Sequence, residues 1–241
     1  MQKVASLLTS TVATALLASS AHAEAAVPRP FSATYAVTYR GIGAGTITFD
    51  FARDDATGRY IYETHASPTA LARLFVSKAA MERSVMEIDD AGTRPIDWRL
   101  DDGKSGKDDD GELRFDWSRN VVTGVVEGET VELATEPNIQ DRSSISIAVT
   151  TALLRGVEPG TIPLVDDNRI KRYVYTKKET ATVDSALGKI DTVIYESTRE
   201  GSNRTSRFWM APSLEFLPVR AEQIRKGKVE TVMTLQKVER P

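Results

Sequence analysis

A single long apolar helix is predicted in a chain whose other segments alternate mainly like β-strands. Within residues 140–156, apolar side chains recur at the i, i+3, i+4, i+7 and i+8 positions of one helical face: Ile145, Ala148, Val149, Ala152 and Leu153. Asp141 or Ser143 can cap the N-terminus, because a short side-chain oxygen accepts from the free N–H groups of the first turn. Gly156 can take the left-handed conformation that ends a helix. One apolar helix among strands must bury its face against a sheet.

The strands are read from period-two alternation bounded by turn residues. They are predicted at residues 31–40, 46–51, 59–66, 81–88, 95–100, 112–117, 121–127, 130–135, 161–165, 169–177, 180–185, 189–199, 203–210, 217–225 and 228–238. A short helix is predicted within residues 68–77. The fold class is therefore mainly β. We expect a large curved antiparallel sheet, open or partly closed like a barrel, with one long and one short helix packed against it.

The N-terminal residues have the pattern of an export signal. Residues 1–23 combine a charged Lys3, a short apolar run and a small-x-small cleavage site, so cleavage is expected after Ala23. Residues 24–30 read as a flexible lead-in, and residues 31–241 as one β-rich domain, with two lobes hinged near residues 136–160 as the alternative. We expect a periplasmic protein. It is not expected to be a lipoprotein, because the chain of 241 residues contains no cysteine.

The charge balance and the distribution of apolar residues disfavour nucleic acid and the bilayer interior as partners. Loss of Lys3 with the signal changes the formal charge from −3 to −4, and no concentrated basic field of the kind that nucleic acids require is apparent. No stretch after the signal is long and apolar enough for a stable membrane span. Nucleic acid and bilayer insertion are therefore not expected for the mature chain.

Residues for the commonest catalytic and metal chemistries are missing. His65 is the single histidine after the signal, and there is no cysteine, so a catalytic triad or a zinc site has few available groups. The glycines of residues 41–45 precede a strand rather than a helix, which favours a hairpin over a phosphate loop. The Asp-rich residues 101–111 predict a solvated tip. We expect no catalytic residue, no metal ligand and no cofactor.

Two groups of side chains remain as candidates for a site. The aromatic and helical residues expected to line a ligand cavity are Trp98, Trp117, Trp209, Phe115, Ile145, Val149 and Leu153. Ordinary core packing is the alternative for the aromatic residues. The second group contains acids, because a glycan hydrolase needs a pair of carboxylates. The acids nearest to aromatic residues or element ends are Asp97, Asp116, Asp141, Glu215 and Glu222.

Several short motifs occur together in a characteristic order. They are Tyr39-Arg40-Gly41 with Gly45, Phe115-Asp116-Trp117, Gln140-Asp141-Arg142-Ser143-Ser144, and Phe208-Trp209-Met210-Ala211-Pro212 leading into Leu217-Pro218-Val219-Arg220. Together they resemble the exported bacterial family known as domain of unknown function 3108, over residues 31–238. The family is similar in layout to periplasmic proteins of the lipoprotein-carrier type, in which a curved antiparallel sheet embraces helices over an apolar cavity.

The resemblance implies structural roles and no catalytic ones. It implies that Asp141 and Arg142 are capping and pairing residues, and that Trp209 and Arg220 fix the C-terminal hairpin to the sheet. We expect a non-enzymatic periplasmic protein that binds an apolar or amphipathic ligand, such as a lipid or lipoprotein, in a concave sheet. One alternative is an envelope scaffold that contacts a protein partner through its surface or edge strands. A carboxylate-based glycan hydrolase is the second alternative.

Overall fold

The computed structural model describes residues 26–70, 80–103 and 110–241. Its strands are β1 (Phe31–Tyr39), β2 (Ile42–Arg53), β3 (Tyr60–Pro68), β4 (Met81–Asp89), β5 (Gly92–Asp101), β6 (Gly111–Asp116), β7 (Val121–Val126), β8 (Glu129–Ala134), β9 (Thr161–Asp166), β10 (Arg169–Ser185), β11 (Gly188–Arg199), β12 (Arg204–Ala211), β13 (Leu217–Arg225) and β14 (Lys228–Glu239). The helix α1 (Ser144–Leu154) and the 3-10 helix η2 (Pro212–Leu214) complete the elements. The predicted helix within residues 68–77 lies largely outside the described residues.

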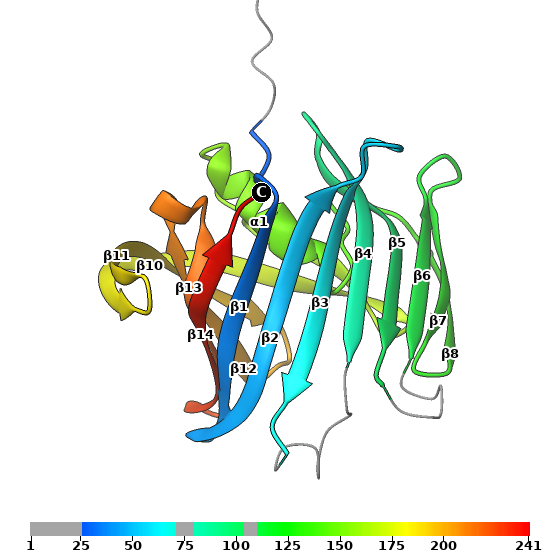
Figure 1. The fold of residues 1–241 in the computed structure, drawn as a ribbon. Coiled ribbons are helices and arrows are strands. Elements are labelled where there is room, and N and C mark those ends of the chain that lie inside the picture. Colours follow the sequence, from blue (N-terminus) through cyan, green and yellow to red (C-terminus); the bar gives the residue numbers. More distant parts are fainter. Residues whose placement is uncertain (1–25, 71–79, 104–109) are drawn as a thin grey trace, which may run out of the picture.

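All fourteen strands belong to one antiparallel sheet, in the order β8-β7-β6-β5-β4-β3-β2-β1-β14-β13-β12-β11-β10-β9. Every neighbouring pair except β1–β14 is a hairpin or meander step along the chain, as short turns between alternating strands predict. The sheet curves strongly and stays open, with β8 and β9 as its two edges (Figure 1). The predicted mainly-β class, with a curved antiparallel sheet and one long helix, is confirmed.

The strand predictions differ from the structure in one notable place. Residues 169–177 and 180–185 form one strand, β10, which continues through an irregular register between Lys177 and Thr180. A bulge lets a strand bend without ending, so the local loss of alternation at these residues looked like a turn in the sequence.

The helix begins with a cap from Asp141. Its Oδ1 atom accepts from the backbone N–H groups of Ser143 and Ser144 at 2.8 and 2.7 Å, whereas Ser143 makes no side-chain capping bond. At the other end, Gly156 has a φ of 70°. Its N–H donates to Leu153, and the N–H of Val157 donates to Ala152, which is the Schellman pattern. Both ends of the helix are thus fixed by the residues that mark them in the sequence.

The segment around α1 connects the two edges of the sheet. The chain leaves edge strand β8, crosses the concave side as α1, and enters the opposite edge strand β9 (Figure 1). Gln140 forms hydrogen bonds to two distant strands of the sheet. Its backbone bonds to Pro163 and Val165 of β9, and its side chain donates to the carbonyl of Thr93 on β5 at 2.8 Å. The helix is buried on more than the predicted stripe, since Ile147 and Thr151 are also buried.

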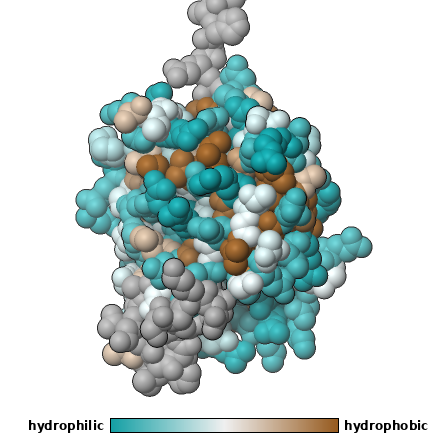
Figure 2. All heavy atoms as spheres, turned by 90° about the vertical axis from the view of Figure 1, so that its right-hand side faces the viewer, coloured by the Kyte–Doolittle hydropathy of each residue, from teal (hydrophilic) through white to brown (hydrophobic). Residues whose placement is uncertain are grey.

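Ion pairs join the two ends of the sheet where no strand pairing does. Arg142 binds Glu127 of the β7–β8 turn, Asp166 at the end of β9 and Asp167 of the following turn. Lys171 contacts the same two aspartates. We call this network the seam. On the side of the molecule that carries β6–β8, apolar patches show between hydrophilic residues (Figure 2).

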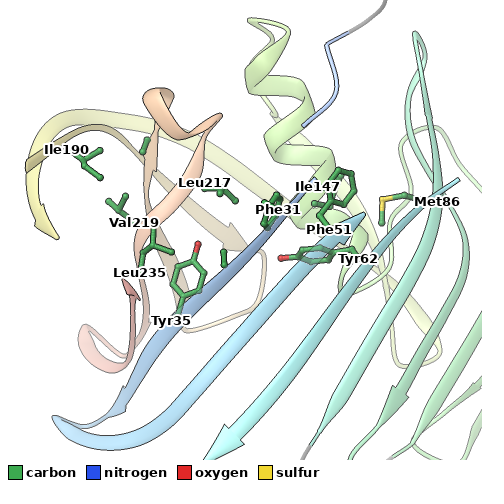
Figure 3. Close-up of a cluster of buried hydrophobic side chains, with 12 residues drawn as sticks. Phe31, Tyr35, Phe51, Tyr62, Met86, Ile147, Ile190, Leu217, Val219 and Leu235 are labelled. Carbon is green, nitrogen blue, oxygen red and sulfur yellow. The ribbon is translucent and has the colours of Figure 1, made fainter. Parts of the chain in front are cut away.

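Three clusters of buried apolar side chains fill the concave side. The first lies between α1, β1–β4 and β11–β14 and contains Phe31, Ala33, Tyr35, Phe51, Tyr62, Met86, Ile147, Ile190, Ala211, Leu217, Val219 and Leu235 (Figure 3). The second gathers Trp98, Leu113, Phe115, Val122, Val126, Val131, Ile139 and Val165. The third packs α1 against β9–β12 through Ile145, Val149, Leu153, Ile162, Leu164, Tyr195 and Met210. Among the described residues, no helix has the length and apolar character needed to cross a bilayer.

Candidate ligand cavity

A cavity of about 220 Å³ lies between α1 and the concave face of the sheet. Its lining residues are Phe31, Tyr35, Phe49, Tyr62, Ser146, Ile147, Val149, Thr150, Tyr175, Tyr195, Phe208, Met210, Leu217, Pro218, Ala221 and Met233. Strand alternation turns these side chains to one face, and α1 closes that face from above. Figure 3 shows Tyr35 on β1 and Tyr62 on β3, with β2 between them, below the helix that carries Ile147.

The sheet side of the cavity is built from register partners. Phe208 of β12 lies opposite Ala221 of β13, and Ala221 lies opposite Met233 of β14. Because cross-strand partners point to the same face, these three residues form one apolar row across adjacent strands. Ala221 lies at the centre of this row, and its small side chain leaves space between the larger Phe208 and Met233.

Four tyrosines bring hydroxyl groups to a largely apolar lining, which also contains Ser146 and Thr150. The hydroxyl of Tyr35 donates to the carbonyl of Pro218 at 2.9 Å, and its ring meets Phe49 edge-on. Burial raises the pKa of Tyr35 and raises that of Tyr62 well above the ordinary tyrosine value. Burial and a hydrogen bond to Glu158 raise the pKa of Tyr195 to about 12. These hydroxyls therefore stay neutral at physiological pH.

The lining contains no charged side chain among the described residues. An uncharged wall of this kind contains no carboxylate pair for glycan hydrolysis. What such a wall offers a ligand is apolar contact area, with a few hydroxyls for orientation. The arrangement suits an apolar chain or ring.

Of the residues predicted to line a cavity, Val149 does so. Ile145 and Leu153 lie beside it in the cluster between α1 and β9–β12. Trp98 is 1% exposed and belongs with Phe115 and Trp117 to the cluster near the β5–β8 end of the sheet. These three aromatic side chains are not part of the cavity lining.

Trp209 also lies outside the lining. Its ring packs against the first core cluster and receives the guanidinium groups of Arg207 and Arg220 at 5.9 and 5.4 Å from the ring centroid. Arg220 is the register partner of Trp209 and also binds Glu222 at 2.6 Å. This geometry links the adjacent strands β12 and β13, and the hairpin role that the resemblance implied stays a prediction.

Sequence reasoning missed all of the aromatic lining. The residues concerned are Phe31, Tyr35, Phe49, Tyr62, Tyr175, Tyr195 and Phe208. Alternation in the first hairpin carries the signal, since Phe31, Ala33 and Tyr35 repeat with period two. That pattern shows which residues share a face. The identity of the concave face comes only from the curvature of the whole sheet.

The acids named as hydrolase candidates lie elsewhere. Asp141 caps α1, and Asp97, Asp116, Glu215 and Glu222 bond to Arg114, Ser118, Arg240 and Arg220, respectively. At the base of the Asp-rich tip, carboxylate oxygens of Asp101, Asp102 and Asp110 lie within 4.8 Å of one another. Of the three, Asp101 is exposed, Asp110 is half-buried and Asp102 is buried, and residues 104–109 of the tip lie outside the described residues.

The model of a family described as a protein of unknown function (DUF3108) matches residues 34–234, which is most of the chain. The chain is a DUF3108 protein. The family resemblance read from the short motifs is thereby confirmed. A comparison with curated proteins finds no match.

This DUF3108 protein is similar, to different extents, to several solved structures. A β-barrel-like protein of the domain of unknown function DUF1849 from Brucella abortus has 12% identity and a TM-score of 0.54, covering 90% of this chain and 100% of that one. A candidate lipoprotein from Parabacteroides distasonis has 8% identity, covers 88% and 97%, and has a TM-score of 0.35. A Bacteroides fragilis protein with a YmcC-like fold has 10% identity, covers 90% and 100%, and has a TM-score of 0.32. At 12% identity, the likeness to the Brucella protein is one of fold alone.

Proposed function

We propose that this DUF3108 protein is a non-enzymatic binding protein that holds an apolar or amphipathic ligand between α1 and the concave sheet. The observation that carries the proposal is the uncharged cavity of about 220 Å³. A buried cavity of about 150 Å³ is already large enough to bind benzene, so this volume admits a segment of an acyl chain or a ring. Aromatic walls add contact area at little cost in side-chain entropy.

The proposed place of action is the periplasm. Support comes from residues 1–23, whose charged start, apolar run and small-x-small end match an export signal. Envelope lipids and lipoproteins, which carry acyl chains, are the ligands that such a protein would meet there. A lipid or lipoprotein acyl chain is therefore the proposed guest.

Native mass spectrometry of the protein purified from a Gram-negative host tests this proposal. We expect a population heavier than the bare chain by the mass of a lipid, which organic extraction releases for identification. A protein that emerges ligand-free, and that takes up no acyl compound from mixed lipid micelles, contradicts the proposal. A heavier species whose extra mass is not an amphiphile contradicts it as well.

One observation favours a second candidate function, an envelope scaffold. β9 pairs with only the first six residues of β10, Arg169 to Val174. Within the described residues, the outer edge of β10 after residue 175 has no strand partner, and such an edge accepts an added strand. Cross-linking in intact envelopes from a site at Thr180 should then capture a reproducible protein partner. Absence of any specific product removes this candidate.

A further inference from the structure

The strands that form the cavity floor continue beyond it on the same face. Along β12 the residues two and four positions before Phe208 are Ser206 and Arg204. Along β13 the residues two and four positions after Ala221 are Gln223 and Arg225. Side chains two positions apart in a strand point to the same face. Both strands therefore pass from an apolar to a neutral polar and then to a cationic residue.

Cross-strand register aligns these residues into layers. Ser206 lies opposite Gln223, and Gln223 opposite Thr231 of β14, which makes a neutral polar row next to the apolar row Phe208–Ala221–Met233. Arg204 lies opposite Arg225, and Arg225 opposite Lys228, which makes a row of three cations. We call Arg204, Arg225 and Lys228 the cation row. Along β12 and β13, four residues of antiparallel strand put it about 13 Å from the apolar row. On β14 a register shift next to Thr231 brings Lys228 opposite Arg225.

The cation row is unusual for a sheet. Like charges directly opposite one another on adjacent strands destabilise the pairing. Within the described residues, none of these three side chains makes an ion pair with a carboxylate, and all three are exposed. The nearby Glu230 is engaged by Arg40 at 2.8 Å. That hydrogen bond from Arg40, together with the charges of Arg225 and Arg204, lowers the pKa of Glu230.

A hollow marks the same place on the surface. It has a volume of about 550 Å³, and its lining residues are Arg40, Arg225, Lys226, Lys228, Val229 and Glu230. Two members of the cation row thus border a space that receives a group from solvent. Arginine and lysine side chains grouped in this way suit phosphate or carboxylate oxygens, because several N–H donors converge on one anion.

From these layers we infer that the ligand is an anionic amphiphile with its apolar chain in the cavity and its phosphate or carboxylate headgroup at the cation row. The neutral row of Ser206, Gln223 and Thr231 then faces the ester or hydroxyl region between them. The inference rests on the proposed function, because it takes the cavity as the chain site. It adds the charge and the orientation of the guest.

The test compares amphiphiles that share one acyl chain and differ in the headgroup. Binding of lysophosphatidylglycerol, palmitate and neutral monopalmitoylglycerol is measured with the wild-type protein and with the variant Arg204→Gln/Arg225→Gln/Lys228→Gln. We expect this variant to bind both anionic ligands at least 10-fold more weakly and the neutral one as before. A matched control, Arg169→Gln/Lys177→Gln/Lys189→Gln, removes three exposed cations outside the row and should leave all three affinities unchanged.

Two outcomes separate the headgroup inference from the proposed function. If the wild-type protein binds the neutral and anionic ligands equally, and the row variant changes neither, the headgroup inference is wrong while the cavity function stands. If no amphiphile binds, both are wrong. Inorganic phosphate is titrated separately, and binding as tight as that of lysophosphatidylglycerol would assign the row to a free anion instead.

A labelling experiment tests whether the bound ligand covers the neutral row between the cavity and the cation row. The chain contains no cysteine, so Gln223→Cys provides a single thiol in the neutral row. We expect lysophosphatidylglycerol to slow maleimide labelling of this thiol at least fivefold. Labelling that proceeds at the same rate with and without the bound ligand contradicts the proposed orientation.

Discussion

Ser84 Oγ on β4 donates a hydrogen bond of 2.7 Å to Oδ2 of Asp141, the residue whose other oxygen caps α1. The first turn of the helix is therefore tied to the sheet beneath it by one fully buried carboxyl group. Removal from water raises the pKa of Asp141 to about 7, although the hydrogen bonds from Ser144, Ser84 and Ser143 oppose the rise. The protonation state of this carboxyl therefore makes the attachment of α1 to the sheet depend on pH.

The Asp141 carboxyl gives the stability a distinct pH dependence. Its pKa is higher in the folded than in the unfolded chain, so the folded state holds the proton longer and is favoured at low pH. We expect the contribution of this group to the free energy of unfolding to fall between about pH 4 and pH 7 and to level off above pH 7. Urea unfolding of the wild-type protein and of Asp141→Asn across this range measures the difference.

Asn at position 141 keeps an acceptor for the cap and removes the titration. The difference in unfolding free energy between Asp141→Asn and the wild-type protein should therefore shift in favour of the variant as the pH rises from 5 to 8. Ser84→Ala serves as the control for loss of one hydrogen bond. A difference that is the same at every pH would show that the Asp141 carboxyl is not protonated in the folded state near neutrality.

Arg142 holds the seam between the two ends of the sheet. It contacts Glu127, Asp166 and Asp167, and its side chain is 26% exposed. We expect Arg142→Gln to lower the free energy of unfolding by about 2 kcal/mol, because a partly buried network loses its shared cation. Arg114→Gln is the matched control, since its side chain is 75% exposed and its bond to Asp97 is 3.5 Å long. It should cost less than about 1 kcal/mol. Equal losses in chemical denaturation would contradict a special role for the seam.

Gly124 lets β7 approach β6 closely. A Cβ atom at this position would lie 2.0 Å from the carbonyl oxygen of Glu112, which is backbone that has no room to retreat. We expect Gly124→Ala to destabilise the fold by about 2 kcal/mol or more, as overpacking against a fixed neighbour does. Gly43→Ala is the control, because a Cβ there meets nothing within 4 Å. The measurement is the midpoint of thermal unfolding, which should be lower for Gly124→Ala than for Gly43→Ala. Similar midpoints would refute the steric explanation.

Much of the secondary structure is readable from the sequence because local rules govern it. The period-two repeat of Phe31, Ala33 and Tyr35 marks a strand with one buried face, and Asp141 and Gly156 mark the ends of the helix. These signals depend on residues within a few positions of one another. Neighbouring strands linked by short turns then predict an antiparallel sheet.

The position of the cavity follows from contacts that no local pattern contains. Trp98 lies in a cluster with Val165, although 66 residues separate them, because α1 carries the chain from one edge of the sheet to the other. Its indole N–H donates to Glu82 at 2.7 Å, and the guanidinium of Arg142 lies over its ring. A bulky aromatic residue in a strand was therefore as compatible with this core as with a cavity. The curvature of the full sheet decides between them.

The central claim is that an apolar chain occupies the cavity beneath α1. Ala221, which lies in the cavity floor between Phe208 and Met233, is the position at which added volume fills that space. Ala221→Phe introduces a ring there, while Ala52→Phe places the same ring at an exposed site on β2. Cooperative thermal unfolding of both variants establishes that they are folded.

The decisive measurement is a fluorescence titration with the uncharged apolar dye N-phenyl-1-naphthylamine. We predict saturable binding by the wild-type protein and by Ala52→Phe, and at least 10-fold weaker binding by Ala221→Phe. Unchanged binding by folded Ala221→Phe, or no saturable binding by the wild-type protein, would contradict the claim that this cavity receives an apolar ligand.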